Sequence, residues 1–214
     1  MATWKDFHEF VLPNVQGCPV GIVNSAIRSA CIEFCEKSLL WQQKSAKTDI
    51  VAGEARYGFA PPAGARVVQP TFASINDEIL LQTNLQDLDD LYPSWRTYAA
   101  AKPTAYFMDG EDTIRLVGKP LEDIPASLEV HVALKPTRDA AECPDFLLED
   151  WAEVIASGAL YRLHAMVGKV WAEPTLSAFH NKLFRAGASL AKGKAAKSRQ
   201  RSTKIVVPRR FGDY

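Results

Sequence analysis

The spacing of apolar residues divides the chain into a helical beginning, a β-like middle and a helical end. Between Thr3 and Leu12, apolar side chains recur at every third or fourth residue, which predicts a short amphipathic helix. A longer stripe with the same spacing predicts a helix from about Val20 to Gln42. Neither helix can bury its apolar face alone, so we expect both to pack against other helices.

The helical spacing is lost between residues 45 and 138. Pro, Gly and β-branched residues become frequent, and short apolar runs alternate with turn residues. Asp109–Asp112 separates two such runs and predicts a hairpin loop, and a short helix is predicted near Leu85–Tyr92. The runs that we predict as strands are Thr48–Val51, Ala65–Pro70, Ile75–Leu81, Ala105–Met108, Thr113–Val117 and Leu128–Leu134. This stretch is therefore predicted to be a small β-rich unit.

Helical spacing returns after residue 138. One helix is predicted to begin at Pro144, because proline is tolerated in the first turn, and to close at Gly168. A second is predicted from Pro174 until its apolar face ends near Ala191. The residues predicted to form the core of the helical part are Ile27, Phe34, Leu147, Trp151, Ile155, Phe179 and Leu183.

The order of these stretches predicts an α+β fold in which a small β-rich insertion interrupts an antiparallel helical bundle. The bundle would combine residues 1–44 with residues 139–196, and the insertion would be residues 45–138. Residues 197–214 would form an extended, basic C-terminal arm. The helical domain is therefore predicted to be discontinuous in sequence.

The composition is that of a soluble protein with a packed core. Apolar residues make up 47% of the chain and charged residues 23%. No apolar run reaches the roughly 20 residues that span a membrane, and the charged N-terminus is unlike a signal peptide. Four cysteines in a chain of 214 residues do not indicate a disulfide framework. We therefore expect synthesis in a reducing compartment and no membrane partner.

The charges are balanced in number but not in position. The chain has 25 basic and 25 acidic residues, yet Lys182–Tyr214 holds ten of the basic residues and one acid, Asp213. Residues 1–181 carry the other 15 basic and 24 acidic residues, a net charge of −9. Such an acidic body with a basic end commonly binds partners of opposite charge.

Candidate chemistry is sparse. The sequence has no nucleotide-binding, zinc-protease or serine-hydrolase motif. Cys31 and Cys35 lie one helical turn apart and could share a metal, but small buried residues explain them better because no third and fourth ligand lies nearby. The acids Asp87, Asp89 and Asp90 are better explained by a helix start than by a divalent-ion site. The histidines His8, His131, His164 and His180 are scattered and indicate packing or surface roles. We expect no enzyme, no cofactor and no metal.

The basic end of the chain has three interpretations. It could be a solvated terminus, a segment that binds the phosphates of nucleic acid, or a segment that docks on a protein. No aromatic residue interleaves with the basic ones before Phe211, which argues against base stacking, and Ile205–Val207 could add a strand to a partner. We favour protein docking, through Arg199, Arg201, Lys204, Ile205, Val206, Val207, Arg209, Arg210, Phe211 and Tyr214.

Several stretches together resemble a known family. The stretches that carry the resemblance are Trp4–Pro19, Ala26–Cys35, Asp112–Leu116, Val132–Pro136, Pro144–Glu153 and Ile155–Leu160. In this order they resemble the head-to-tail adaptors of short-tailed phages, which are related in role to the tail tubular protein A group. The resemblance covers nearly the whole chain, although it consists of packing patterns and contains no catalytic signature.

The resemblance implies a structural virion protein. Such adaptors form a ring, typically of twelve copies, that binds the portal protein, continues the DNA channel and offers its far side to the tail nozzle. Here the arm at residues 197–214 would reach the portal, and genomic DNA would pass without sequence-specific binding. The protein would be made in the host cytoplasm and reside in the virion neck. The alternative is a DNA-binding accessory protein that uses the basic tail.

Overall fold

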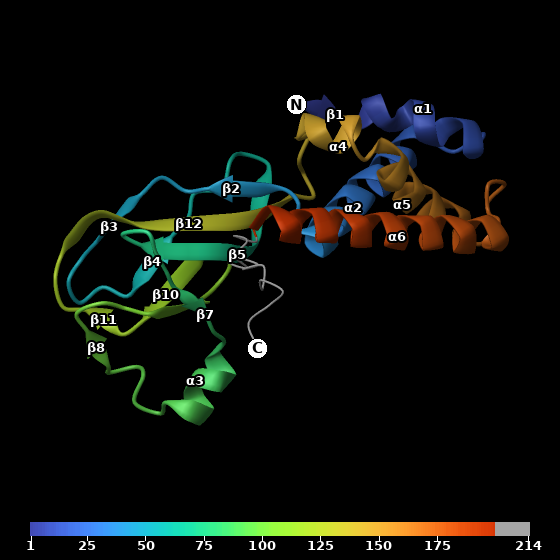
Figure 1. Cartoon of the computed structure of the whole chain (residues 1–214). Coiled ribbons are helices and arrows are strands. Elements are labelled where there is room, and N and C mark those ends of the chain that lie inside the picture. The colour runs from blue at the N-terminus through green and yellow to red at the C-terminus, as the bar shows by residue number, and fades with distance from the viewer. Residues whose placement is uncertain (200–214) are drawn as a thin grey trace, which may run out of the picture.

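The structure is a computed structural model and describes residues 1–199, which adopt an α+β fold. Figure 1 shows most helices gathered at one end of the molecule and most strands at the other. We call these parts the helical unit and the β unit. The helical unit takes residues from both ends of the described chain, and the β unit lies between them in sequence.

The N-terminal segment is a chain of short turns rather than the single helix predicted over Thr3–Leu12. A 3₁₀ turn at Trp4–Phe7, α1 at His8–Val11 and a second 3₁₀ turn at Leu12–Asn14 follow one another. Before them, β1 (Ala2–Thr3) pairs with β13 (Glu142–Cys143), which joins the two ends of the helical unit.

The helix α2 spans Val20–Ser38 and ends four residues before the predicted boundary at Gln42. It stops because Leu39 adopts a left-handed conformation with φ of 54°, which turns the chain out of the helix. The next residues then form β2 (Gln42–Lys44), which pairs with a long strand of the β unit.

The helix predicted from Pro144 to Gly168 is two helices. They are α4 (Asp145–Glu149) and α5 (Ala152–His164). The break falls at Trp151, whose backbone leaves helical geometry and whose ring packs 5.3 Å from that of Phe34. Gly168 has a φ of +77° in the turn beyond α5, so it lies after the helix end and does not cap it.

The last helix, α6, spans Pro174–Arg199. It begins at the proline where the sequence predicts it, but continues past Ala191, where the apolar face was expected to end. The predicted boundary between helix and arm at residue 197 therefore falls inside α6. The helix packs against α5 and α2, and Figure 1 places α1 and α4 on the other side of these two helices.

The β unit consists of two main sheets and a small helical corner. Its first sheet has the strand order β2, β12 (Ile124–Pro136), β5 (Ala65–Ile75) and β6 (Glu78–Ile79), and β3 (Thr48–Ile50) also pairs with β12. The second has the order β4 (Arg56–Gly58), β10 (Thr113–Val117), β9 (Ala105–Met108) and β7 (Leu81–Gln82). A two-stranded pair of β8 (Ala99–Ala100) and β11 (Lys119–Pro120) and the helix α3 (Leu85–Leu91) complete it.

Most of the strand predictions are confirmed, as is the hairpin loop between β9 and β10. The prediction of one strand over Ile75–Leu81 is wrong. Asn76 and Asp77 both have positive φ, 49° and 66°, and form the two-residue turn that joins β5 to β6. Asn and Asp tolerate this conformation better than most residues, which is why they occur at such turns.

Each unit has its own apolar core, and Trp41 contacts both. The core of the β unit draws on both sheets and buries Ile75 and Ile114 completely. The core of the helical unit draws on residues near both ends of the chain and includes Phe34, Cys143 and Phe184. Where the units meet, the side chain of Lys135 on β12 donates to Glu36 on α2 at 2.6 Å.

Candidate interaction surfaces

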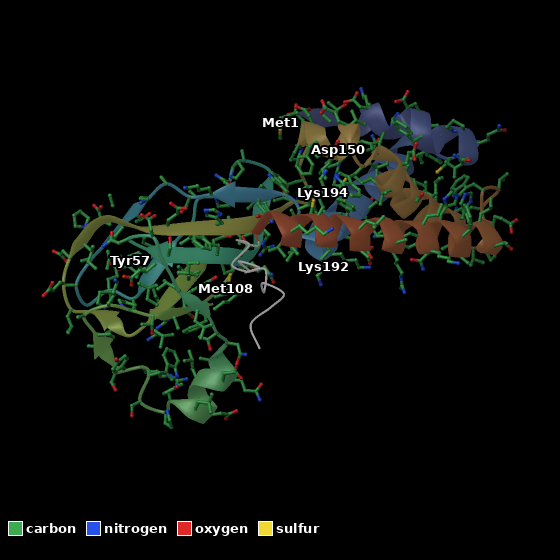
Figure 2. The ribbon with its side chains drawn as sticks, in the orientation of Figure 1. Met1, Tyr57, Met108, Asp150, Lys192 and Lys194 are labelled. Atoms are coloured by element: carbon green, nitrogen blue, oxygen red, sulfur yellow. The ribbon has the colours of Figure 1, made fainter. Side chains whose placement is uncertain are left out.

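The helix α6 is basic from Lys182 onward and contains no acidic residue between Pro174 and Arg199. Its exposed cations are Lys182, Arg185, Lys192, Lys194 and Lys197. Figure 2 places Lys192 and Lys194 at the end of α6 that lies nearest the β unit. Lys194 lies 3.9 Å from Asp150 and over the ring of Trp151, so this cation is partly neutralised within the chain.

The buried face of α6 is narrow and, apart from one phenylalanine, built from small residues. It runs through Phe184, Gly187, Ala188, Ala191 and Ala195. The prediction that Phe179 and Leu183 belong to the core is wrong, because their side chains are 55% and 44% exposed. Leu183 precedes Phe184 by one residue, so its side chain points about 100° around the helix axis from that of Phe184 and away from the buried face.

The apolar residues on the exposed side of α6 form a row of their own. Leu176, Phe179, Leu183 and Leu190 follow one another at spacings of three, four and seven residues, so they share one side of the helix. Leu176 and Leu190 are 42% and 71% exposed. The row is about 21 Å long at 1.5 Å per residue. We call these four residues the α6 stripe.

Two glycines allow α6 and α2 to approach α5 closely. A Cβ at Gly158 of α5 would lie 2.7 Å from the ring of Phe184 and 2.9 Å from Ala30. A Cβ at Gly187 of α6 would lie 2.5 Å from Val154. Because neither position has room for a methyl group, these glycines fix the separation of the three helices and hence the orientation of the α6 stripe.

A polar cluster ties α2 to α5. Glu33 accepts a hydrogen bond from Tyr161 at 2.9 Å and forms ion pairs with Arg162 and Lys37. Burial acts to raise the pKa of Glu33, but the bonds from Lys37 and Tyr161 and the charge of Arg162 outweigh it, so the pKa lies below its usual value. The cluster is therefore charged at neutral pH and fixes the register of the two helices.

The side of the helical unit that carries α1 and α4 is acidic. Glu9, Glu149 and Glu153 are exposed there, and Asp145 pairs with the N-terminal amine at 2.8 Å. A surface depression of about 310 Å³ lies among these acids and is lined by Phe10, Leu148, Trp151 and Val154, together with Glu149, Asp150, Ala152 and Glu153. We call this region the acidic face. It combines apolar contact area with negative charge, which is the complement of α6.

The groups that could carry chemistry are occupied by structural contacts. His8 hydrogen-bonds Asn24 and His131 hydrogen-bonds Glu129, while His164 bonds the carbonyl of Trp171 and stacks on His180. Burial raises the pKa values of Cys31 and Cys35, which keeps both thiols protonated. Among residues 1–199, no three His, Cys, Asp or Glu side chains are grouped to hold a metal.

The acids of α3 have structural partners. Asn84 caps the helix by accepting from the backbone N–H of Asp87 at 2.8 Å. Asp89 accepts from the indole N–H of Trp95 at 2.8 Å and pairs with Arg96, and these bonds lower its pKa. Two of the three acids therefore shape the corner of the β unit.

The predicted site residues divide into three groups. Ile27, Phe34, Leu147 and Ile155 are fully buried and Trp151 is partly buried, whereas Phe179 and Leu183 are exposed. Arg199 ends α6. The remaining docking residues, Arg201, Lys204, Ile205, Val206, Val207, Arg209, Arg210, Phe211 and Tyr214, lie outside the described residues. Sequence reasoning missed the α6 stripe and the acidic face, although the regular spacing of the stripe is visible in the sequence.

In the described part of the chain, no helix has the length and apolar character to cross a bilayer.

The sequence matches the family model of the SU10 adaptor protein over residues 16–209, which is more than half of the chain. No curated protein matches the chain.

Proposed function

The chain belongs to the SU10 adaptor protein family, and we propose that this phage structural protein is a ring-forming head-to-tail adaptor. The observation that carries the proposal is the family match, which spans both the helical and the β units. The ring joins the portal protein to the tail nozzle in the virion neck and continues the DNA channel. By resemblance, it consists of twelve copies and is related in role to the tail tubular protein A group.

Each part of the chain has a role in this proposal. The helical unit is the antiparallel bundle that builds the ring wall, and the β unit projects towards neighbouring copies or the tail. Residues 197–214 dock on the portal. The role depends on geometry and needs no chemical step, so the protein is proposed to be non-enzymatic. It is made in the host cytoplasm before assembly.

The surplus of acids over residues 1–181 supports passage of DNA through such a ring. These residues carry a net charge of −9, and negative charge repels phosphates. A channel wall with this charge lets genomic DNA slide without sequence-specific binding. The basic α6 and the basic residues that follow it favour a second candidate, a DNA-binding accessory protein.

Sedimentation with purified portal protein and with duplex DNA separates the two candidates. An adaptor sediments with the portal at moderate salt and leaves DNA in the supernatant. A protein that binds duplex DNA, loses that binding steeply as salt rises and ignores the portal is the accessory protein. Removal of residues 197–214 is expected to abolish sedimentation with the portal, whereas the accessory protein would lose its affinity for DNA.

A further inference from the structure

We infer that the α6 stripe of one copy docks on the acidic face of a second copy of this chain. The inference rests on the proposed ring, which needs a contact between two different surfaces of identical subunits. The two surfaces are built from different residues of the helical unit: the stripe lies on α6, and the acidic face lies on α1, α4 and α5, with its edge at Asp150, Trp151 and Val154 in contact with α6. Copies joined in this way leave one free surface of each kind, so the chain of contacts continues until the ring closes.

The composition of the stripe fits a protein partner. Four large apolar side chains in one row, each at least 42% exposed, offer contact area that phosphates cannot use. Lys182 follows Phe179 by three residues and Lys197 follows Leu190 by seven, so cations border the row. Such a surface fits a partner that is apolar at its centre and acidic at its rim.

The acidic face of the same chain has that composition. Phe10, Leu148, Trp151 and Val154 line its depression, and Glu149 and Glu153 lie at the same depression. Charge also argues against the idea that the chain's own C-terminal end covers the α6 stripe. Residues 200–214 carry Arg201, Lys204, Arg209 and Arg210 against one acid, so they have the same sign as α6.

The first test removes the apolar part of the contact. Full-length chains with Phe179→Asp and Leu183→Asp are titrated onto purified portal rings, and the mass of chain bound per portal is measured by sedimentation. Since both side chains are exposed, circular dichroism should confirm an unchanged fold. We expect the concentration for half-occupancy to rise by tenfold or more, with loss of cooperativity. The matched control carries Val167→Asp and Val170→Asp, which are 95% and 96% exposed outside the stripe, and should behave as wild type.

The second test reverses charges on each surface and then on both. Lys182→Glu should weaken assembly several-fold at low salt, as should Glu149→Lys with Glu153→Lys, because like charges then face one another. The chain with all three substitutions restores opposite charges across the contact and should recover assembly. If the α6 stripe contacts a surface other than the acidic face, the combined variant should not recover assembly.

The outcomes separate the inference from the proposed function. If wild type forms no multiple-copy assembly, alone or with the portal, the ring itself is wrong. If wild type assembles and the Phe179→Asp, Leu183→Asp chain assembles equally well, the ring stands and the α6 stripe is not its contact. If the acid-reversed chain assembles as wild type, α6 meets another surface, and the pairing with the acidic face is wrong. Failure of the variant with all three charge reversals to recover overturns the pairing in the same way.

Discussion

The helical unit and the β unit bury their apolar residues in different ways. The β unit is continuous in sequence and packs large side chains from both sheets, such as Ile75 and Ile114, into one core. The helical unit joins distant parts of the chain and packs α6 through glycine, alanine and Phe184, while the four large apolar side chains of the α6 stripe stay exposed. The exposed row on α6 is thus a surface of the helical unit that is free to contact a partner, which agrees with the proposed place of this unit in the ring wall.

The β unit also exposes large apolar residues, but they are arranged differently. Leu81 lies on β7, whereas Leu91 and Tyr92 lie at the end of α3, directly after its acids. On α6 the exposed apolar residues follow one side of a single helix that contains cations and no acid. A row on one long helix presents a continuous surface to a partner, whereas scattered exposed residues are common on any protein.

The largest expected effect comes from truncating a core residue of each unit. Phe34→Ala should lower the free energy of unfolding by about 3–5 kcal/mol, and Ile114→Ala by about 2–5 kcal/mol, because each side chain is fully buried. Hydrogen exchange by mass spectrometry should show faster exchange mainly in α2 and α5 for the first change, and mainly in the β unit for the second. Equal loss of protection in both units would contradict the separation into two cores.

The glycine contacts give the next largest effect. Gly158→Ala and Gly187→Ala should each destabilise the chain by about 1–3 kcal/mol, because the new methyl group collides with Phe184 or Val154. Gly193→Ala is the matched control on α6, since a Cβ there meets nothing within 4 Å. It should stabilise the helix by up to about 1 kcal/mol. Urea unfolding measures all three, and equal effects at the three positions would refute the close-packing argument.

The Glu33 cluster should make part of the stability depend on pH. Glu33→Gln is expected to cost about 1 kcal/mol at pH 7, because Arg162 loses a charged partner while both remain in partial contact with water. The folded pKa of Glu33 lies below the ordinary value of 4.5, so its contribution is complete above pH 4.5 and is lost as pH falls through the folded pKa. Urea midpoints between pH 3 and pH 7 should therefore fall less steeply for the variant than for wild type. If the urea midpoints of the variant and of wild type fell in parallel with pH, Glu33 would have no such role in stability.

The smallest effect is expected at the pair of Lys194 and Asp150. Both side chains are more than half exposed and 3.9 Å apart, so solvent screens the interaction. Lys194→Ala should leave the urea midpoint unchanged within experimental error. A clear loss of stability would mean that the pair helps to join α6 to α4 and α5, and that the end of α6 is held more firmly than its exposure indicates.

The sequence predicted element types better than it predicted which faces are buried. The spacing at three and four residues correctly located α2, α5 and α6, because any amphipathic helix has this period. The same period could not separate Phe179 and Leu183 from Phe184, since apolar residues follow two sides of α6. The break between α4 and α5 lies at Trp151, which packs against Phe34, a residue more than one hundred positions earlier. Local sequence patterns do not encode such a contact.

The candidate surfaces were predicted less completely than the fold. Charge counting located the basic end of the chain, but the acidic face combines residues from α1, α4 and α5 that only the folded chain brings together. The two glycines at the helix contacts give no distinctive signal in sequence. Their importance follows from the atoms that surround them.

The mass of the purified full-length protein, alone and after mixing with its portal protein, tests the central claim most directly. Native mass spectrometry or light scattering counts the chains in each species. The account predicts that chains join the portal in one fixed multiple and form a closed assembly of identical copies. Chains that remain single in the presence of the portal, or that bind it in variable number without contact between copies, would contradict a ring-forming adaptor.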